Sequence, residues 1–203
     1  YQMLPIVPLR DIMGNYAGTF GGPSLGSFSN SVANQERDSQ DINYNWGIAG
    51  NVFADVKILK NLVFTTSLGV NYGTNYERNF EATQTENVQG SSSDSRLIIN
   101  SSYSNTLTFT NTLKYNNNFN LHNIQLLAGT EAISYIGRSL TGGASNLFIE
   151  DESYLNLNNG TVNITNGSSV KSNSLFSIFG RVDYDYSKKY LASITLRRDG
   201  SSK

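Results

Sequence analysis

The feature that most constrains the fold of this chain is an alternation of apolar and polar residues with a period of two. Within residues 102–115, serine, threonine and lysine fill most of one parity. The other parity carries the large apolar side chains of Tyr103, Leu107, Phe109, Leu113 and Tyr115. A period of two places the two sets on opposite faces of a β-strand. No helical spacing of three and four residues is sustained, so the sequence predicts an all-β chain.

The same alternation predicts six strands that pair as three antiparallel hairpins. The strands are 46–57 with 62–76, 102–115 with 124–136, and 174–186 with 190–198. Short turns are expected at 58–61, 116–123 and 187–189, and long polar loops at 77–101 and 137–173. Strand 62–76 exceeds the usual five or six residues, and suits a tilted strand that crosses a membrane in about 9–11 residues. Alternation of short turns with long loops is typical of outer-membrane barrels, which makes residues 1–45 an irregular extracellular loop.

Composition excludes several classes of function. The chain has 203 residues and a net charge of −1, which gives no basic surface for nucleic acid. It has no cysteine, and the single histidine, His122, excludes a multi-histidine metal site. No apolar run approaches the roughly 18 residues of a membrane-spanning helix. Tyr1 is not a natural start, so we interpret the chain as an internal fragment.

Five segments, in this order, resemble the SusC/RagA family of TonB-linked outer-membrane transporters. They are PIVPLRD with GNYAG (5–18), GNVFAD with LVFTTSLG (50–69), HNIQLLAGTE (122–131), FGRVDY (179–184) and YLASITLRRDGSSK (190–203). The resemblance implies an antiparallel up-and-down transmembrane β-barrel segment of about six strands with long extracellular loops. Its apolar face is expected to meet lipid. Residues 1–203 would be an internal fragment of the barrel, without the plug domain, the TonB box and the C-terminal strands.

The resemblance also implies a function. A protein of this family is an outer-membrane importer of glycan or peptide fragments that is driven through TonB and capped by a SusD-like surface lipoprotein. Neither a cofactor nor an enzymatic activity is expected. Two alternatives stay open: a soluble secreted β-sandwich that binds carbohydrate or acts as an adhesin, and a β-rich glycoside hydrolase that uses Asp183 and Asp185 as its carboxylate pair.

Candidate functional residues fall into two groups. Polar side chains on the strand face opposite the apolar one are expected to line the lumen: Glu131, Arg181, Asp183 and Asp185. Residues at or in the 137–173 loop are expected to contact substrate or the lipoprotein, because aromatic faces stack and asparagine both donates and accepts hydrogen bonds: Tyr135, Asn146, Phe148 and Tyr154. The acidic triplet 150–152 would suit Ca²⁺, or is simply solvated. Tyrosines at strand ends fit an interfacial girdle or plain strand propensity.

Overall fold

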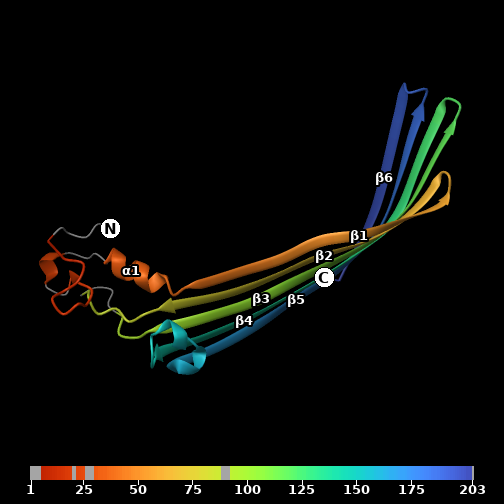
Figure 1. Cartoon of the computed structure of the whole chain (residues 1–203). Helices are drawn as coiled ribbons and strands as arrows, with labels where there is room; N and C mark the ends of the chain where they lie inside the picture. The colour runs from red at the N-terminus through yellow and green to blue at the C-terminus, as the bar shows by residue number, and fades with distance from the viewer. Residues whose placement is uncertain (1–5, 20–21, 26–29, 88–91, 203) are drawn as a thin grey trace. The chain divides into compact units, whose positions relative to one another are not determined.

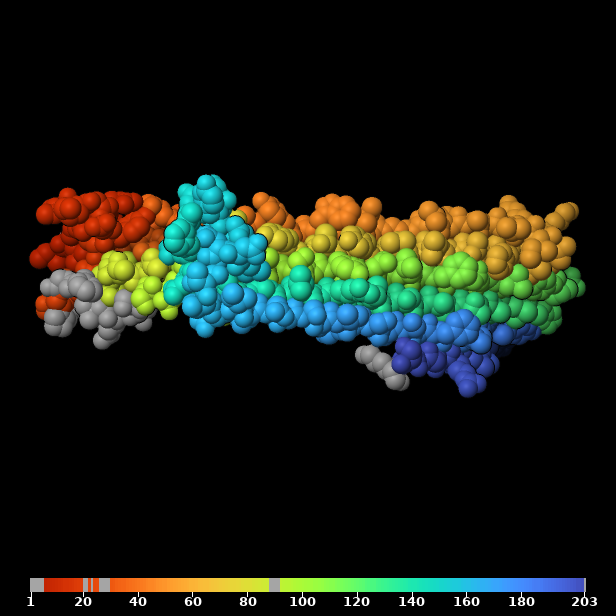
Figure 2. Space-filling model, turned by 90° about the horizontal axis from the view of Figure 1, so that it is seen from below, coloured from red at the N-terminus to blue at the C-terminus, as the bar shows by residue number. Residues whose placement is uncertain are grey.

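The computed structural model describes residues 6–19, 22–25, 30–87 and 92–202, and within them it confirms an all-antiparallel β-sheet. Six strands lie side by side in chain order (Figures 1 and 2). They are β1 (Ile42–Leu59), β2 (Leu62–Glu81), β3 (Arg96–Phe119), β4 (His122–Leu147), β5 (Gly160–Tyr186) and β6 (Tyr190–Ser201). Each strand pairs with the one before it, which is the up-and-down order that the sequence predicts. The sheet does not close on itself.

The strands are longer than predicted, and the predicted long loops are correspondingly wrong in extent. The two long connections shrink to 82–95 and 148–159, and the turn expected at 116–123 is a two-residue connection at 120–121. The extensions are rich in asparagine, glycine, serine and threonine and carry few large apolar side chains, so no sustained apolar alternation marks them, yet their backbones still pair with neighbouring strands. Asn120 takes a φ of 53°, a left-handed conformation that asparagine tolerates. Short turns still alternate with longer connections.

The chain divides into two compact units. We call residues 1–45, 75–102 and 139–169 the loop-end unit, because it contains both long connections. Residues 46–74, 103–138 and 170–203 form the turn-end unit, which contains the short turns. The loop-end unit has eleven acidic residues against four arginines, a net charge of −7, whereas the turn-end unit has five acidic against eleven basic residues, a net charge of +6.

The loop-end unit contains structure where the sequence predicts an irregular loop. Helix α1 (Ser31–Asp38) and the 3-10 turn η2 (Pro23–Leu25) precede β1, so part of the segment predicted as an irregular loop is helical. The 3-10 turns η3 (Glu152–Tyr154) and η4 (Leu157–Asn159) lie in the connection between β4 and β5. A small core of Phe80, Leu97, Leu147 and Leu155 holds this connection against the strands. Pro5, Gly21 and Gly26, which contribute to the loop prediction, lie outside the described residues.

The turn-end unit is a two-faced sheet. On one face, which we call the polar face, the Thr65 hydroxyl donates to Asp55, and Gly69 lies against Thr108. The opposite face, the apolar face, exposes Leu68, Leu107, Phe109, Phe176, Ile178, Val182, Ile194 and Leu196. The β5–β6 register agrees with this division, since Val182 lies opposite Ile194 and Phe179 opposite Arg197. No helix within the described residues is long and apolar enough to cross a membrane.

Candidate functional site

A charged network on the polar face of the turn-end unit brings together three strands. Arg197 on β6 donates to Glu131 on β4 at 2.8 Å and to the hydroxyl of Ser177 on β5 at 2.9 Å. Its Nε donates to Asp199 at 2.7 Å. Charge-assisted bonds to two carboxylates hold the guanidinium in one place. The predicted site residue Glu131 is therefore part of a structural cross-strand network, and its partners Arg197, Asp199 and Ser177 are absent from the predicted site.

An aromatic ring completes this network. Phe179 on β5 lies over Gly129 on β4 so closely that a Cβ on the glycine would come within 2.5 Å of the ring. The guanidinium of Arg197 lies 5.7 Å from the centre of the same ring, within the range of a cation–π contact. The glycine therefore makes room for the ring, and the ring supports the arginine. Sequence reasoning could have found Phe179 as the large apolar residue on a polar parity.

The other predicted polar-face residues form separate contacts. Arg181 pairs with Asp183 at 2.8 Å on β5. Asp185 accepts instead from the backbone N–H of Lys188 at 2.7 Å, and so fixes the turn at 187–189. Each carboxylate is held by a different group, which gives no support to the carboxylate pair that a glycoside hydrolase would need.

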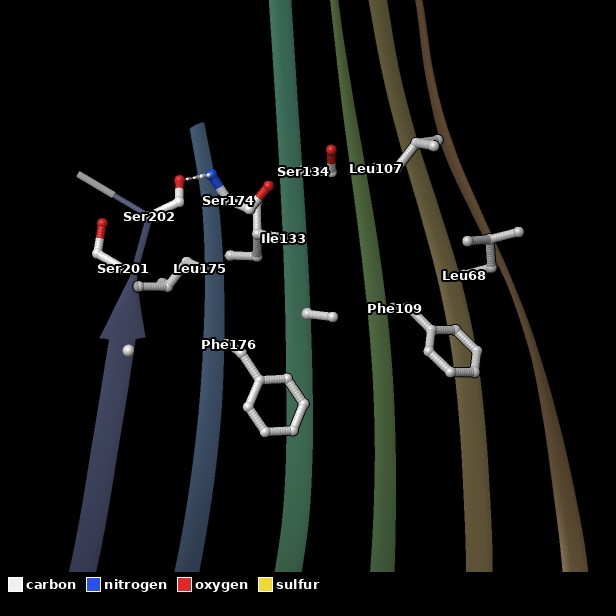
Figure 3. A pocket seen from close by; sticks show the side chains of 12 residues that line it. Leu68, Leu107, Phe109, Ile133, Ser134, Ser174, Leu175, Phe176, Ser201 and Ser202 are labelled. Carbon is white, nitrogen blue, oxygen red and sulfur yellow. Dashed lines mark hydrogen bonds between the residues drawn. The ribbon is translucent and has the colours of Figure 1, made fainter. Parts of the chain in front are cut away.

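The apolar face of the turn-end unit carries a shallow hollow (Figure 3). Leu68, Leu107, Phe109 and Phe176 contribute side chains from β2, β3 and β5, and hydroxyls of Ser134, Ser174, Ser201 and Ser202 lie along its edge. None of the described residues that line it is ionisable. The hollow therefore offers apolar contact and no group for acid–base chemistry.

Aromatic rings gather at both ends of the apolar face in the turn-end unit. Tyr72 contacts Trp46 edge-on at 6.0 Å and stacks on Tyr103 at 6.3 Å, which links β1, β2 and β3. At the short turns, Tyr186 stacks on Tyr190 at 6.4 Å and lies 4.9 Å from the ring of His122. The strand-end tyrosines thus form contact clusters that cross strands, an arrangement that strand propensity alone does not require.

The predicted contact residues divide between the units. Tyr135 lies half-buried on β4 in the turn-end unit, with its hydroxyl 2.6 Å from where a Cβ of Gly137 would be. Phe148 and Tyr154 lie in the 148–159 connection of the loop-end unit and are 84% and 54% exposed. Asn146 was predicted in a loop but belongs to β4, with a φ of 54°, and its backbone N–H donates to Ser95.

Exposed aromatic side chains in the 148–159 connection rest on a fixed backbone. The side chain of Asn159 donates to the carbonyls of Ile149 and Tyr154 at 2.8 and 3.3 Å. The backbone N–H of Phe148 donates to the carbonyl of Asn159 at 3.0 Å. Figure 2 shows the connection, in cyan, as a compact block. Phe148 and Tyr154 are therefore presented by a small folded segment that is suited to stacking on a ligand.

The acidic triplet of this connection is not arranged as a calcium site. Glu150 accepts from Thr83, Asp151 accepts from the N–H of Ser153 at the start of η3, and Glu152 pairs with Arg78 at 3.4 Å. The three carboxylates thus have three separate partners. Among the described residues, no group of three or more histidine, cysteine, aspartate or glutamate side chains is placed to hold a metal ion.

A largely buried ion pair fixes α1 in the loop-end unit. Arg37 donates to both carboxylate oxygens of Glu86 at 2.7 and 3.0 Å. Burial alone would raise the pKa of Glu86, but the hydrogen bonds from Arg37 and from backbone N–H groups outweigh it, and the net result is a lowered pKa. Glu86 therefore stays ionised and holds the helix against the 82–95 connection.

Comparisons with known proteins define the class. No protein-family model matches the chain. It is 40% identical over 98 residues to the TonB-dependent receptor P3 of Formosa agariphila, a match that covers 48% of the chain and 10% of that receptor. It is 30% identical over 155 residues to the TonB-dependent receptor P39 of the same organism, covering 74% of the chain and 14% of the receptor. The chain thus spans a small part of the curated relatives it matches.

Solved structures of the RagAB peptide importer show the same fold. The open-open state aligns with a TM-score of 0.69 and 21% identity, over 81% of the chain and 18% of the importer chain. The closed-closed state aligns with a TM-score of 0.73 and 18% identity, over 94% and 21%. These relatives and neighbours are named receptors and importers, and none of them is named an enzyme.

The antiparallel sheet with one exposed apolar and one polar face is a segment of β-barrel wall of the kind found in TonB-dependent receptors. The chain belongs to these receptors, and its five sequence segments resemble their SusC/RagA type.

Proposed function

We propose that this chain forms part of an outer-membrane importer for nutrient oligomers, either glycan or peptide fragments. In this proposal the turn-end unit forms part of the barrel wall, and the loop-end unit forms part of its extracellular rim. The observation that carries the proposal is the similarity to a TonB-dependent receptor over 74% of the chain. The RagAB structures are those of a peptide importer, which supports an oligomeric nutrient as substrate. We propose further that the receptor works with TonB and with a SusD-like surface lipoprotein.

The spacing of aromatic residues supports a place in the membrane. Tyr103 and Tyr115 lie twelve residues apart on the apolar parity of β3. At about 3.3 Å per residue this is roughly 40 Å along the strand, and a tilt of about 35–45° reduces it to roughly 28–33 Å. That height matches an apolar band of about 25 Å with an aromatic girdle at each border. The exposed apolar face then meets lipid, and the polar face, with Glu131 and Arg197, meets the lumen.

The chain spans only a small share of its relatives, which supports placing other functional parts of the receptor outside it. Because it covers 10% and 14% of the two receptors, we propose that the plug domain, the TonB box and the C-terminal strands lie elsewhere in the full-length protein. Six strands with open edges cannot stand alone in lipid, so this segment contributes wall and rim within a complete barrel.

The placement is tested by single cysteines in the full-length receptor on whole cells. A cysteine at Ser153, in the connection 148–159, should react with a membrane-impermeant maleimide, and one at Ser187, in a short turn, should react only after the outer membrane is opened. Labelling of Ser187→Cys but not Ser153→Cys on intact cells would reverse the topology. A full-length protein that stays in solution without detergent would instead favour the soluble sandwich.

Import is tested separately. Disruption of the receptor gene should abolish growth on its cognate oligomer while growth on the corresponding monomer is kept. Growth of both strains at the same rate on every glycan and peptide oligomer tested would contradict the importer function.

A further inference from the structure

A small hairpin in the loop-end unit, residues 9–17, presents two apolar side chains to solvent. The side chain of Ile12 is fully exposed and that of Met13 is 80% exposed. Neither side chain is buried by another of the described residues. Exposed apolar groups that are contiguous mark interaction sites more often than isolated ones do.

The hairpin that carries this tip is rigid. An antiparallel bridge joins Arg10 to Tyr16. The Asp11 carboxylate accepts from the N–H groups of Met13 and Asn15 at 2.8 and 2.9 Å, and Gly14 supplies the positive φ of 89° that the turn needs. The tip conformation is therefore set before any partner arrives, which removes most of the ordering cost of binding.

The base of the hairpin is anchored to α1. Asn30, completely buried, donates from its amide to the carbonyls of Leu9 and Ala17, each at 2.9 Å. Its side-chain oxygen caps α1 by accepting from the N–H groups of Val32 and Ala33. Both Arg10 and Tyr16 also contact Glu36 on the helix. One residue, Asn30, thus fixes the hairpin and the helix together.

The net charge of the loop-end unit indicates which kind of surface Ile12 and Met13 contact. The loop-end unit has a net charge of −7, so an anionic membrane surface would repel it. The same charge favours a protein face on which basic side chains surround an apolar socket. We propose that the tip, Ile12 and Met13, inserts into such a socket on the surface lipoprotein that acts with this receptor. The proposal rests on the proposed function, which supplies the partner, and adds the surface through which the partner docks.

Retention of the lipoprotein by the full-length receptor tests the proposal. The double variant Ile12→Ser, Met13→Ser should bind the lipoprotein at least about 100-fold more weakly, as expected for two buried apolar side chains of this size. The matched control, Leu59→Ser with Leu121→Ser, removes two exposed leucines at the short turns and should bind as the wild type does. Association of the wild type should also slow as salt is raised.

The possible outcomes test the partnership between receptor and lipoprotein separately from the docking surface at Ile12 and Met13. If the wild-type receptor purifies without any lipoprotein, the partnership in the proposed function is wrong. If the wild type and the double variant retain the lipoprotein equally, the tip is not the docking surface. Heat-modifiable migration of the variants must match the wild type, which shows that the barrels are assembled.

Cysteine labelling gives a second readout that does not depend on affinity. Met13→Cys should react with an impermeant maleimide on cells that lack the lipoprotein and be protected on cells that contain it. Protection in both strains would mean that the tip packs against another part of the same receptor. Reaction in both would mean that nothing covers the tip, and either result overturns the proposal.

Discussion

A methyl group added at Gly129 would disturb the packing of Phe179 against Gly129 on the polar face. The new Cβ would lie 2.5 and 2.7 Å from two carbons of the Phe179 ring and 2.9 Å from the carbonyl oxygen of Asn111. The ring can turn aside, but the paired backbone of Asn111 cannot move freely. Overpacking of this kind costs about 1–3 kcal/mol. Displacement of the ring also removes the support under Arg197, so we expect Gly129→Ala to lower the free energy of unfolding by about 2 kcal/mol.

Gly69→Ala is the matched control for this substitution. Gly69 lies on the same polar face, but a Cβ there would meet Thr108 at 3.6 Å, an ordinary van der Waals distance. Its substitution should therefore change the free energy of unfolding by less than about 0.5 kcal/mol. The measurement is denaturant unfolding of the detergent-solubilised full-length receptor, followed by heat-modifiable migration.

A double-mutant cycle identifies the ring as the cause. In a Phe179→Ala background the ring is gone, so Gly129→Ala should lose most of its cost and the two substitutions should be non-additive by about 1 kcal/mol or more. Strict additivity, or equal costs for Gly129→Ala and Gly69→Ala, would refute the argument that the glycine exists to accommodate Phe179.

Three further predictions concern the faces and the rim. Phe109→Arg, on the apolar face, should impair assembly by about 2–4 kcal/mol near the bilayer midplane, whereas Thr108→Arg on the polar face should be tolerated in whole-cell assembly assays. Because the pKa of Glu86 is lowered on folding, the contribution of its pair with Arg37 is complete above the unfolded pKa of about 4.3 and is lost as pH falls through the folded pKa. Limited proteolysis of the loop-end unit should accelerate in that range, and Glu86→Gln should weaken this pH dependence. Removal of residues 149–158 should abolish uptake or lipoprotein capture while the barrel still assembles, and normal growth on the cognate oligomer would contradict a role for this connection and for Tyr154, the exposed aromatic side chain that the deletion removes.

The alternating part of the fold could be predicted because, in the proposed barrel, the bilayer imposes a pattern on it. In residues 102–115 every second position must suit lipid, and that requirement is visible as period-two alternation. Beyond the apolar band of the barrel, both faces of a strand meet water or protein. The end of β4, residues 137–147, therefore carries glycine, serine and threonine without a pattern. The strand ends are therefore invisible to periodicity, although backbone pairing continues through them.

The 9–17 hairpin and helix α1 of the rim could not be predicted, because polar contacts between residues far apart in the sequence hold them in place. Asn30 orders the 9–17 hairpin and caps α1, but a lone asparagine in a glycine-rich segment predicts only a turn or a cap. Helix α1 has one buried residue, Ala33, so it has no apolar stripe by which periodicity could reveal it. Arg37 pairs with Glu86 across 49 positions, a separation that no local pattern encodes.

The candidate residues on the polar face lie on strands β4 and β5, and their partners limit what they can do. Glu131 and Asp199 share Arg197, and Asp183 binds Arg181, so the charge of these carboxylates is largely but not fully balanced by the two arginines. In the proposed importer, three carboxylates against two guanidinium groups leave little net charge on this face to hold a hydrated oligomer. Selectivity is then expected from the rim, where Phe148 and Tyr154 expose aromatic surface on a folded connection and rigid strands position a variable segment.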